Sequence, residues 1–206
     1  TQPANTLFRQ AQLKVPANQS LARPSSFAAV FEPFTAQAFA AKIPQSGAGI
    51  GPLGIAFHPD GQRAYLLNEL DATIDAFAYE ARTGELTRLQ TISALPPQFH
   101  GKPWAADIHV TPNGAFVYAS ERTSSTLAAF RIDARNGQLS SIGHFETETQ
   151  PRAFAIDPTG RFLLAAGERS NAVISYAIDE ASGKLTALKR CSVGESPNWV
   201  EIINLP

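Results

Sequence analysis

An internal repeat limits the fold of this chain more than any other feature. The segments FHPDGQRAYLLNEL, VTPNGAFVYASER and IDPTGRFLLAAGER align without gaps on Pro59, Pro112 and Pro158, which are 53 and 46 residues apart. In each segment a glycine follows two residues after the proline. A second set of glycine turns, in ARTGEL, ARNGQL and ASGKL, recurs with the same offsets. Two landmarks in phase indicate three copies of one structural unit.

Each unit has the sequence pattern of four β-strands. Short apolar segments, such as residues 64–67, 73–79 and 116–118, lie between the turns and are typical of strands. Proline presets φ at the second position of a turn and glycine accepts positive φ, so the first type of turn predicts a hairpin. The later glycine turns would join a third strand to a fourth. Four antiparallel strands per repeat of about 46 residues are typical of a propeller blade.

The sequence therefore predicts an all-β fold, a β-propeller with blades over about residues 48–104, 105–150 and 151–196. Residues 197–206 match the first strand of a further blade, so the predicted ring is incomplete. The first unit is longer than the second, and its extra residues, within 94–104, are expected to form a loop between blades. A β-sandwich is the alternative, but it has no reason to repeat its turn chemistry in phase.

Residues 1–47 differ from the rest of the chain. They contain prolines and many alanines but no x-P-x-G turn, which predicts an irregular N-terminal segment. The sequence leaves open whether this segment is an arm or cap, a poorly ordered leader or a stretch foreign to the native protein. Because the chain contains no methionine, even at position 1, we expect a trimmed product or a fragment.

The composition excludes several classes of function. Lysine and arginine total 17 against 18 acidic residues, so no net positive charge favours nucleic acid or a membrane surface. No segment approaches the roughly 18 apolar residues of a membrane helix, and the N-terminus lacks a signal-peptide pattern. Cys191 is the only cysteine and cannot form a disulfide within the chain. These features predict a cytoplasmic protein. No histidine pair has zinc-site spacing, so we predict no metal, and no Gly-rich loop indicates a nucleotide cofactor.

Three stretches closely resemble the propeller-type 6-phosphogluconolactonases, namely YLLNELDATIDAF (65–77), WAADIHVTPNG (104–114) and ETQPRAFAIDPTGRFLLAAG (148–167). This seven-bladed family also includes fungal muconate-lactonizing enzymes, and the resemblance covers about residues 47–206. It implies a hydrolase of the pentose phosphate pathway that opens 6-phosphogluconolactone to 6-phosphogluconate without a cofactor. The implied partner is a small phosphorylated sugar lactone.

The chain also departs from this family pattern. About three more blades are expected ahead of residue 47, and a family active-site histidine would lie there. The family's G-P-R-H segment reads Gly51-Pro52-Leu53-Gly54 here, so its arginine is missing. The alternatives are a non-catalytic scaffold, a degenerate paralogue or a muconate-type lactone chemistry. Open blade edges would also favour association with a second chain.

The repeat itself points to site residues on the first strand of each blade. First strands line the channel of a propeller, so their polar side chains can reach a ligand. Six residues before the landmark proline stand Leu53, Ala106 and Arg152, and Asn198 occupies the corresponding place in the last segment. Arg152, in Q-P-R, resembles the family's site arginine and would hold a phosphate or a developing oxyanion. The alternative is a solvated arginine at the rim.

Ten residues after the landmark proline stand Glu69, Arg122 and Glu168. Glu69, in N-E-L, matches the family's site glutamate and could hold or deprotonate the attacking water, although a surface ion pair is the alternative. Arg122, in E-R-T-S, is a weaker phosphate-binding candidate. His109, in A-D-I-H, has either a substrate-binding or a structural role. The predicted catalytic residues are thus Glu69 and Arg152, with Arg122, His109 and Asn198 as substrate-binding candidates.

Overall fold

The structure is a computed structural model that describes residues 52–203. These residues form three antiparallel sheets of four strands, each in simple sequential order. The first sheet contains β1 (Pro52–Phe57), β2 (Arg63–Asn68), β3 (Thr73–Glu80) and β4 (Glu85–Ser93). The second contains β5 (Ala105–Val110), β6 (Phe116–Glu121), β7 (Thr126–Ile132) and β8 (Leu139–Glu146). The third contains β9 (Pro151–Ile156), β10 (Phe162–Gly167), β11 (Ala172–Ile178) and β12 (Leu185–Ser192).

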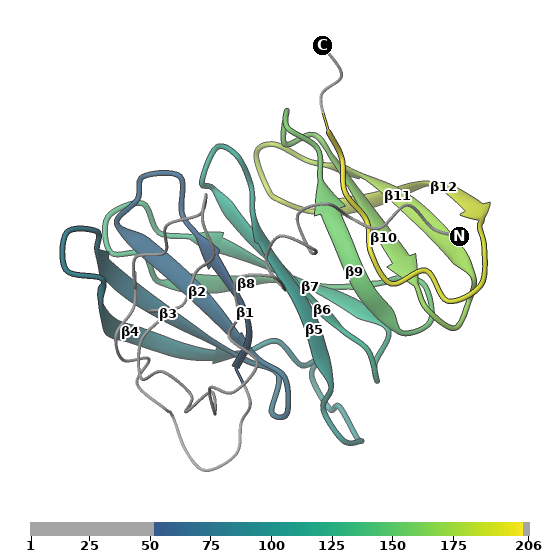
Figure 1. The fold of residues 1–206 in the computed structure, drawn as a ribbon, viewed down its shortest axis with the longest axis horizontal. Coiled ribbons are helices and arrows are strands. Elements are labelled where there is room, and N and C mark those ends of the chain that lie inside the picture. The colour runs from purple at the N-terminus through teal and green to yellow at the C-terminus, as the bar shows by residue number, and fades with distance from the viewer. Residues whose placement is uncertain (1–51, 204–206) are drawn as a thin grey trace, which may run out of the picture.

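The three sheets are arranged as consecutive propeller blades (Figure 1). The first strand of the middle blade, β5, lies between β1 and β9, whereas β4 and β12 lie at opposite outer ends. Leu53, Ala106 and Arg152 each occupy the second position of a first strand, as the repeat predicts. The three sheets do not close into a ring, which confirms the predicted incomplete propeller.

Both types of turn have the predicted conformation. Gly61, Gly114 and Gly160 lie in the turns after β1, β5 and β9, with φ of 69°, 71° and 73°. The amide of each donates to a carbonyl three residues earlier, as in a β-turn. The glycines of the later turns also have positive φ, and their amides reach four residues back. The turn chemistry seen in the sequence therefore sets the connections within each blade.

Two further features repeat in phase, although no landmark in the sequence marks them. Bulges interrupt the pairing of third and fourth strands after Ala76, Ala129 and Ser175, which are equivalent positions. The turns from second to third strand end on Ala72, Ser125 and Asn171, whose φ values are 52°, 56° and 50°. Bulges increase strand twist, so their regular spacing gives the blades a common shape.

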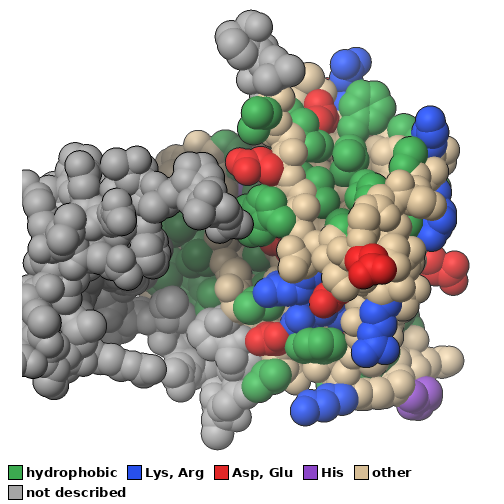
Figure 2. Space-filling model, turned by 45° about the vertical axis from the view of Figure 1, so that its right-hand side comes forward, with side chains coloured by type: hydrophobic (Ala, Val, Ile, Leu, Met, Phe, Trp, Pro, Cys, Tyr) green, Lys and Arg blue, Asp and Glu red, His purple; other side chains and the backbone are tan. Residues whose placement is uncertain are grey.

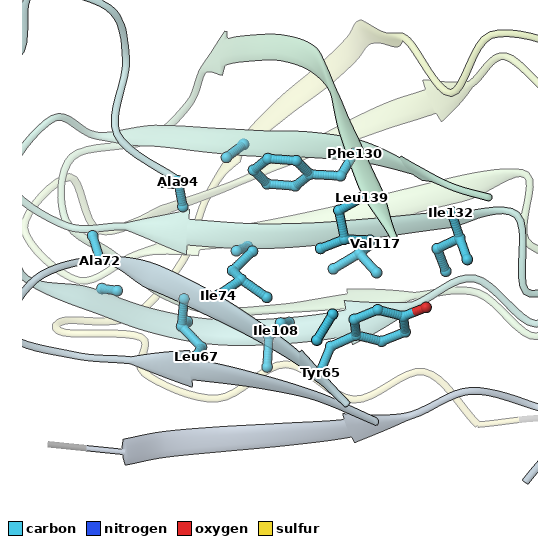
Figure 3. Packing of buried hydrophobic residues seen from close by; sticks show 14 residues of the cluster. Tyr65, Leu67, Ala72, Ile74, Ala94, Ile108, Val117, Phe130, Ile132 and Leu139 are labelled. Atoms are coloured by element: carbon cyan, nitrogen blue, oxygen red, sulfur yellow. The ribbon is translucent and has the colours of Figure 1, made fainter. Parts of the chain in front are cut away.

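The blades pack through apolar side chains that alternate along each strand. One cluster joins the first two blades and includes Tyr65, Leu67 and Ile74 from one blade and Val117 and Phe130 from the next (Figure 3). A second cluster joins the second and third blades in the same way. The second and third strands of the first two blades, β2, β3, β6 and β7, are buried on both faces along most of their length, which explains their apolar runs. Among the fourth strands, β4 and β12 are mostly exposed and β8 is partly exposed.

The structure differs from the sequence prediction at the C-terminal end. Residues 94–104 form the expected irregular connection between blades. The predicted strand over 197–206, however, is not formed in its described part, 197–203. The first strand of a blade is held by hydrogen bonds to the second strand, and no described strand pairs with this segment. The predicted irregular segment 1–47 lies outside the described residues.

Candidate active site

An ion pair between adjacent blades forms the centre of the candidate site. Glu69 directly follows β2, and Arg122 directly follows β6. The Nη2 atom of Arg122 donates to Oε1 of Glu69 at 2.5 Å and to the carbonyl of Ala105 at 2.8 Å. The Arg122 side chain is only 5% exposed. Arg122 is therefore better placed to position Glu69 than to contact a ligand directly.

Trp104 completes this arrangement from the loop before β5. Its indole Nε1–H donates to Oε1 of Glu69 at 2.9 Å, and the guanidinium of Arg122 lies 3.8 Å from its ring centroid. Both donors to Glu69 thus bind the same oxygen. The other oxygen, Oε2, accepts no hydrogen bond from residues 52–203. Glu69 is held in place with one carboxylate oxygen still able to accept a proton or a hydrogen bond.

Glu121 fixes the backbone around the ion pair. Its side chain is fully buried at the end of β6. One carboxylate oxygen accepts the amide of Trp104 at 2.7 Å, and the other accepts the amide of Ser124 at 2.5 Å. A buried carboxylate that receives two backbone amides rigidifies both segments. Glu121 therefore supports the position of Trp104 and of the turn that carries Arg122.

The electrostatics extend this cluster to the third blade. Burial lowers the pKa of Arg122, while the hydrogen bond and charge of Glu69 oppose that change. The charge of Arg152 also lowers the pKa of Arg122, and that of Glu168 raises it, so both groups act on the same region. Arg152 is half-buried and has no hydrogen bond or ion pair with another residue of 52–203. The site thus includes a cation available to an anionic ligand.

His109 lies further along β5 and belongs to a separate network. Its Nε2 atom lies 3.1 Å from Oδ2 of Asp107, which also accepts the amide of Phe154 from β9. The imidazole packs edge to face against the Phe154 ring, with 4.7 Å between centroids. No contact within 52–203 connects His109 to the Glu69 cluster, and it links two first strands instead.

Asn198 is not brought to the cluster by any contact. It is exposed in the irregular segment after β12 and forms no hydrogen bond with the described residues. Asn198 was placed by analogy with a first strand, and that strand is not formed. Its substrate-binding role stays a prediction.

The sequence analysis did not single out Trp104, Glu121 or Asp107. The repeat contained a signal for Trp104 and Asp107, because the equivalent positions differ between blades, but not for Glu121, whose counterpart Asn68 is also polar. Trp104 corresponds to Gly51 and Gln150 in the aligned units. Asp107 corresponds to two small apolar residues, Gly54 and Ala153. A polar or aromatic residue found in one blade alone is not needed to build a blade, which favours a role in a site.

The described part of the chain contains neither a metal-binding cluster nor a membrane-spanning helix. No group of three or more histidine, cysteine, aspartate or glutamate side chains within residues 52–203 is arranged to bind a metal ion. In the same residues there is no helix long and apolar enough to cross a membrane. The Cys191 thiol is free and exposed on β12.

Several curated proteins that are similar to this chain share one name. Two bacterial proteins named 6-phosphogluconolactonase are each 47% identical to this chain over 158 residues. They come from Pectobacterium carotovorum and Serratia proteamaculans, and the match covers 77% of this chain and 48% of each relative. The chain thus spans about half the length of the curated relatives it matches.

A solved structure gives the same result. The periplasmic gluconolactonase PpgL of Pseudomonas aeruginosa is 34% identical, with a TM-score of 0.72 over 78% of this chain and 44% of that protein. Residues 33–202 match the family described as Lactonase, 7-bladed beta-propeller. Because this match covers most of the chain and agrees with the observed blades, the chain belongs to the seven-bladed β-propeller lactonase family.

Proposed function

We propose that this chain provides part of the active site of a 6-phosphogluconolactonase, in which Glu69 activates water and Arg152 stabilises the oxyanion. One observation carries the proposal. Glu69 is fixed through Oε1 by Arg122 and Trp104, and among residues 52–203 its Oε2 accepts no hydrogen bond. The charge of Arg152 acts on Arg122, and Arg152 itself has no hydrogen bond or ion pair within the same residues. A base and a cation in one region match the needs of lactone hydrolysis.

The proposed chemistry is the addition of water to the lactone carbonyl. Oε2 of Glu69 accepts a proton as the water oxygen bonds to the carbonyl carbon, and the carbonyl oxygen becomes an oxyanion beside Arg152. The bond from this carbon to the ring oxygen then breaks, and the ring oxygen takes up a proton. The product is the open-chain acid. Water supplies every added atom, so the reaction needs no oxidant or cofactor.

The substrate and pathway come from the relatives. Two of them are named 6-phosphogluconolactonase, and PpgL is named a gluconolactonase. These names support a phosphorylated sugar lactone as substrate and a place in the pentose phosphate pathway. We also propose a cytoplasmic location, because the free thiol of Cys191 fits a reducing compartment. Because PpgL is named as periplasmic, cell fractionation with an antibody to this chain is the direct test.

A non-catalytic scaffold is the second candidate function. It is favoured by Leu53, which is exposed at the position where the family resemblance places an arginine. Replacement of a charged hydrogen-bonding group by leucine costs about 1.5 to 3 kcal/mol of interaction with a charged ligand. A scaffold would bind a partner through the same rim without turnover.

The test is hydrolysis of 6-phosphogluconolactone at neutral pH, corrected for spontaneous opening. The protein is purified from its complete gene, and its mass is compared with the translated sequence. We expect Glu69→Gln and Arg152→Ala each to lower kcat by roughly 10² to 10³. Glu85→Gln, at an exposed carboxylate at the start of β4, is the control and should keep wild-type activity. Activity that is unchanged in both site variants would refute the assignment, and no turnover by the complete protein would favour the scaffold.

A further inference from the structure

A cavity of about 320 Å³ lies beside the Glu69 cluster, at the junction of the first two blades. Its lining comes from the turn after β2, the loop before β5 and the turn after β6, and consists of Leu70, Lys102, Pro103, Trp104 and Thr123. This volume is in the range of small-molecule sites. Trp104 belongs both to the cavity and to the ion-pair cluster, so a molecule bound in the cavity would lie next to Glu69.

Most of the wall of this cavity belongs to a segment that the other connection between blades lacks. Three of its residues lie in the segment 94–104, where the first unit exceeds the second in length. The connection between the second and third blades, residues 147–150, is much shorter. Because the third blade is joined to the second without such a loop, the fold does not require it. An extra loop that lines an open pocket next to a candidate active site favours a binding role.

The aromatic surface in this cavity is held rigidly. One face of the Trp104 indole is covered by Arg122, and its N–H is bonded to Glu69. The side chain nevertheless remains 38% exposed. Its orientation is therefore fixed before any ligand arrives, and the exposed part is an apolar surface. A preorganised surface binds with a smaller loss of conformational entropy than a mobile one.

The same cavity is also lined by a positively charged side chain, that of Lys102. Lys102 is exposed, and its ammonium group forms no ion pair with a residue of 52–203. Its backbone is nevertheless anchored, because the Thr123 hydroxyl donates to the Lys102 carbonyl at 2.8 Å. The cavity thus combines a fixed aromatic surface with a lysine on an anchored segment. Lysine binds phosphate as a compact point charge, and an aromatic ring packs against the apolar face of a sugar.

We propose that this cavity binds a phosphorylated six-carbon sugar acid or lactone, with the sugar packed on Trp104 and the phosphate at Lys102. The choice of a six-carbon sugar rests on the proposed function, whereas the phosphate and the packing rest on the cavity itself. Binding of the phosphate at Lys102 leaves Arg152 for the oxyanion. Phosphate binding and oxyanion binding, the two alternatives for Arg152, are then performed by different residues.

The fluorescence of Trp104 provides a direct measurement of binding. The chain contains two tryptophans, and Trp199 is 76% exposed in the irregular C-terminal segment. In the Trp199→Phe variant of the purified 206-residue chain, Trp104 is the remaining tryptophan. We expect its emission to change and saturate on addition of 6-phosphogluconate, a stable ligand of the proposed class. Gluconate and inorganic phosphate, added separately, should each bind more weakly. The converse variant, Trp104→Phe, reports from Trp199 and should show no saturable change.

A charge-removing variant then tests the role of Lys102. In the Trp199→Phe background we expect Lys102→Ala to weaken 6-phosphogluconate binding at least about tenfold and to leave gluconate binding unchanged. Lys189→Ala, at an exposed lysine of β12, is the matched control and should bind as before. Equal affinity in Lys102→Ala, or no response of Trp104 to 6-phosphogluconate, would overturn the proposal.

The outcomes separate this proposal from the proposed function. Binding at Trp104 that depends on Lys102, in a complete protein that does not hydrolyse the lactone, would refute the lactonase function and keep the cavity assignment. Hydrolysis that is indifferent to Lys102→Ala, together with no response of Trp104 fluorescence to 6-phosphogluconate, would refute the cavity assignment and keep the function. Each proposal can thus fail without the other.

Discussion

A buried tyrosine at the same position of two blades shows how single residues join neighbouring blades. The hydroxyl of Tyr65 donates to the carbonyl of Gly137 at 3.1 Å, and that of Tyr118 donates to the carbonyl of Gly183 at 2.7 Å. Tyr65 and Tyr118 stand six residues after their landmark prolines, and each glycine belongs to the later turn of the next blade. These tyrosines therefore fix the distance between one sheet and the turns of the next. Leu164 occupies this position in the third blade.

We predict that Tyr118→Phe lowers the free energy of unfolding by about 1 to 2 kcal/mol, because the Gly183 carbonyl loses a buried donor while the ring packing is kept. Tyr79→Phe is the matched control, since the Tyr79 hydroxyl forms no hydrogen bond with residues 52–203, and its effect should be smaller than about 0.5 kcal/mol. Urea unfolding followed by circular dichroism measures both variants. Equal effects would show that the hydroxyl bond contributes nothing to the contact between blades.

A second residue-scale prediction concerns His144. Its Nε2–H donates to the Ala94 carbonyl at 3.1 Å, and burial lowers the pKa of the imidazole, although the hydrogen bond opposes this. The folded protein then disfavours protonation, whereas the unfolded chain takes up a proton near the ordinary pKa of about 6.5. The contribution of neutral His144 to stability is therefore present above that pH and is lost as the pH falls below it.

His144→Gln should reduce this pH dependence, because glutamine does not titrate and can still donate to Ala94. We expect the loss of unfolding free energy between about pH 7.5 and about pH 5 to be smaller in the variant than in the wild type. Denaturant unfolding at the two pH values measures the difference. The other histidines are common to both proteins, so their contribution cancels. An identical pH dependence would exclude His144 as the cause.

The turns are the elements that the sequence predicts best. Pro59, Pro112 and Pro158 and the glycines that follow them act locally, so their effect on the backbone is visible in the sequence. The positive φ of Ala72, Ser125 and Asn171 was not visible in the sequence, because residues other than glycine seldom adopt positive φ. There, pairing of the flanking strands sets the backbone. Local chemistry thus predicts a turn where glycine or proline dictates it, but not where the sheet imposes it.

Two glycines in equivalent turns allow a test at the scale of the element. Gly61 and Gly114 have nearly the same φ, 69° and 71°. A Cβ at Gly61 would meet no atom within 4 Å, whereas one at Gly114 would overlap the ring of His58, which donates to the Gly114 carbonyl. We predict that Gly61→Ala costs about 1 to 2 kcal/mol of stability for its backbone conformation. Gly114→Ala should cost clearly more, because it also displaces a contact between blades.

Thermal unfolding of both variants measures the difference. A lower Tm for Gly114→Ala than for Gly61→Ala is the expected result. Equal values would mean that His58 moves away freely and that the turn of one blade is not tightly packed on the next.

At the scale of the whole molecule, the repeat predicted the architecture and pointed to part of the candidate site, whose role in catalysis stays a prediction. The blades followed from landmarks in phase, and Glu69 and Arg152 followed from equivalent positions read with the family resemblance. The contact of Trp104 with Glu69 could not be predicted, because it depends on how a loop of irregular backbone folds between two blades. The strand predicted at the C-terminal end is not formed in residues 197–203, since a strand forms only when another strand pairs with it.

Exposed hydrophobic side chains on the third blade lead us to predict self-association. Phe162 is 39% exposed there, whereas the equivalent Phe116 is buried against the third blade. Leu188 on β12 is also exposed, and Figure 2 shows hydrophobic side chains among charged ones over this side of the molecule. Exposed apolar surface on an open propeller favours contact with a second chain. We expect the chain to associate reversibly as its concentration rises.

Sedimentation velocity over a range of concentrations measures this association. Phe162→Lys should shift the equilibrium towards the monomer, because a charge at this position opposes an apolar contact. Leu89→Lys, at a comparably exposed leucine on β4, is the control and should have little effect. A chain that stays monomeric at every concentration would contradict the prediction.

The final prediction is that this polypeptide alone has weak or no 6-phosphogluconolactonase activity. Opening a lactone requires a positioned water, a base and donors directed at the oxyanion, and loss of one donor costs about 3 to 4 kcal/mol in the barrier. Glu69 and Arg152 are present, but Leu53 stands where the family resemblance places a second cation, and the three blades do not close a ring. Turnover should therefore depend on what completes the ring. Hydrolysis by the purified 206-residue chain, corrected for spontaneous opening and measured with its mass in solution, tests this. Turnover by a verified monomer equal to that of its 6-phosphogluconolactonase relatives would show that three blades suffice.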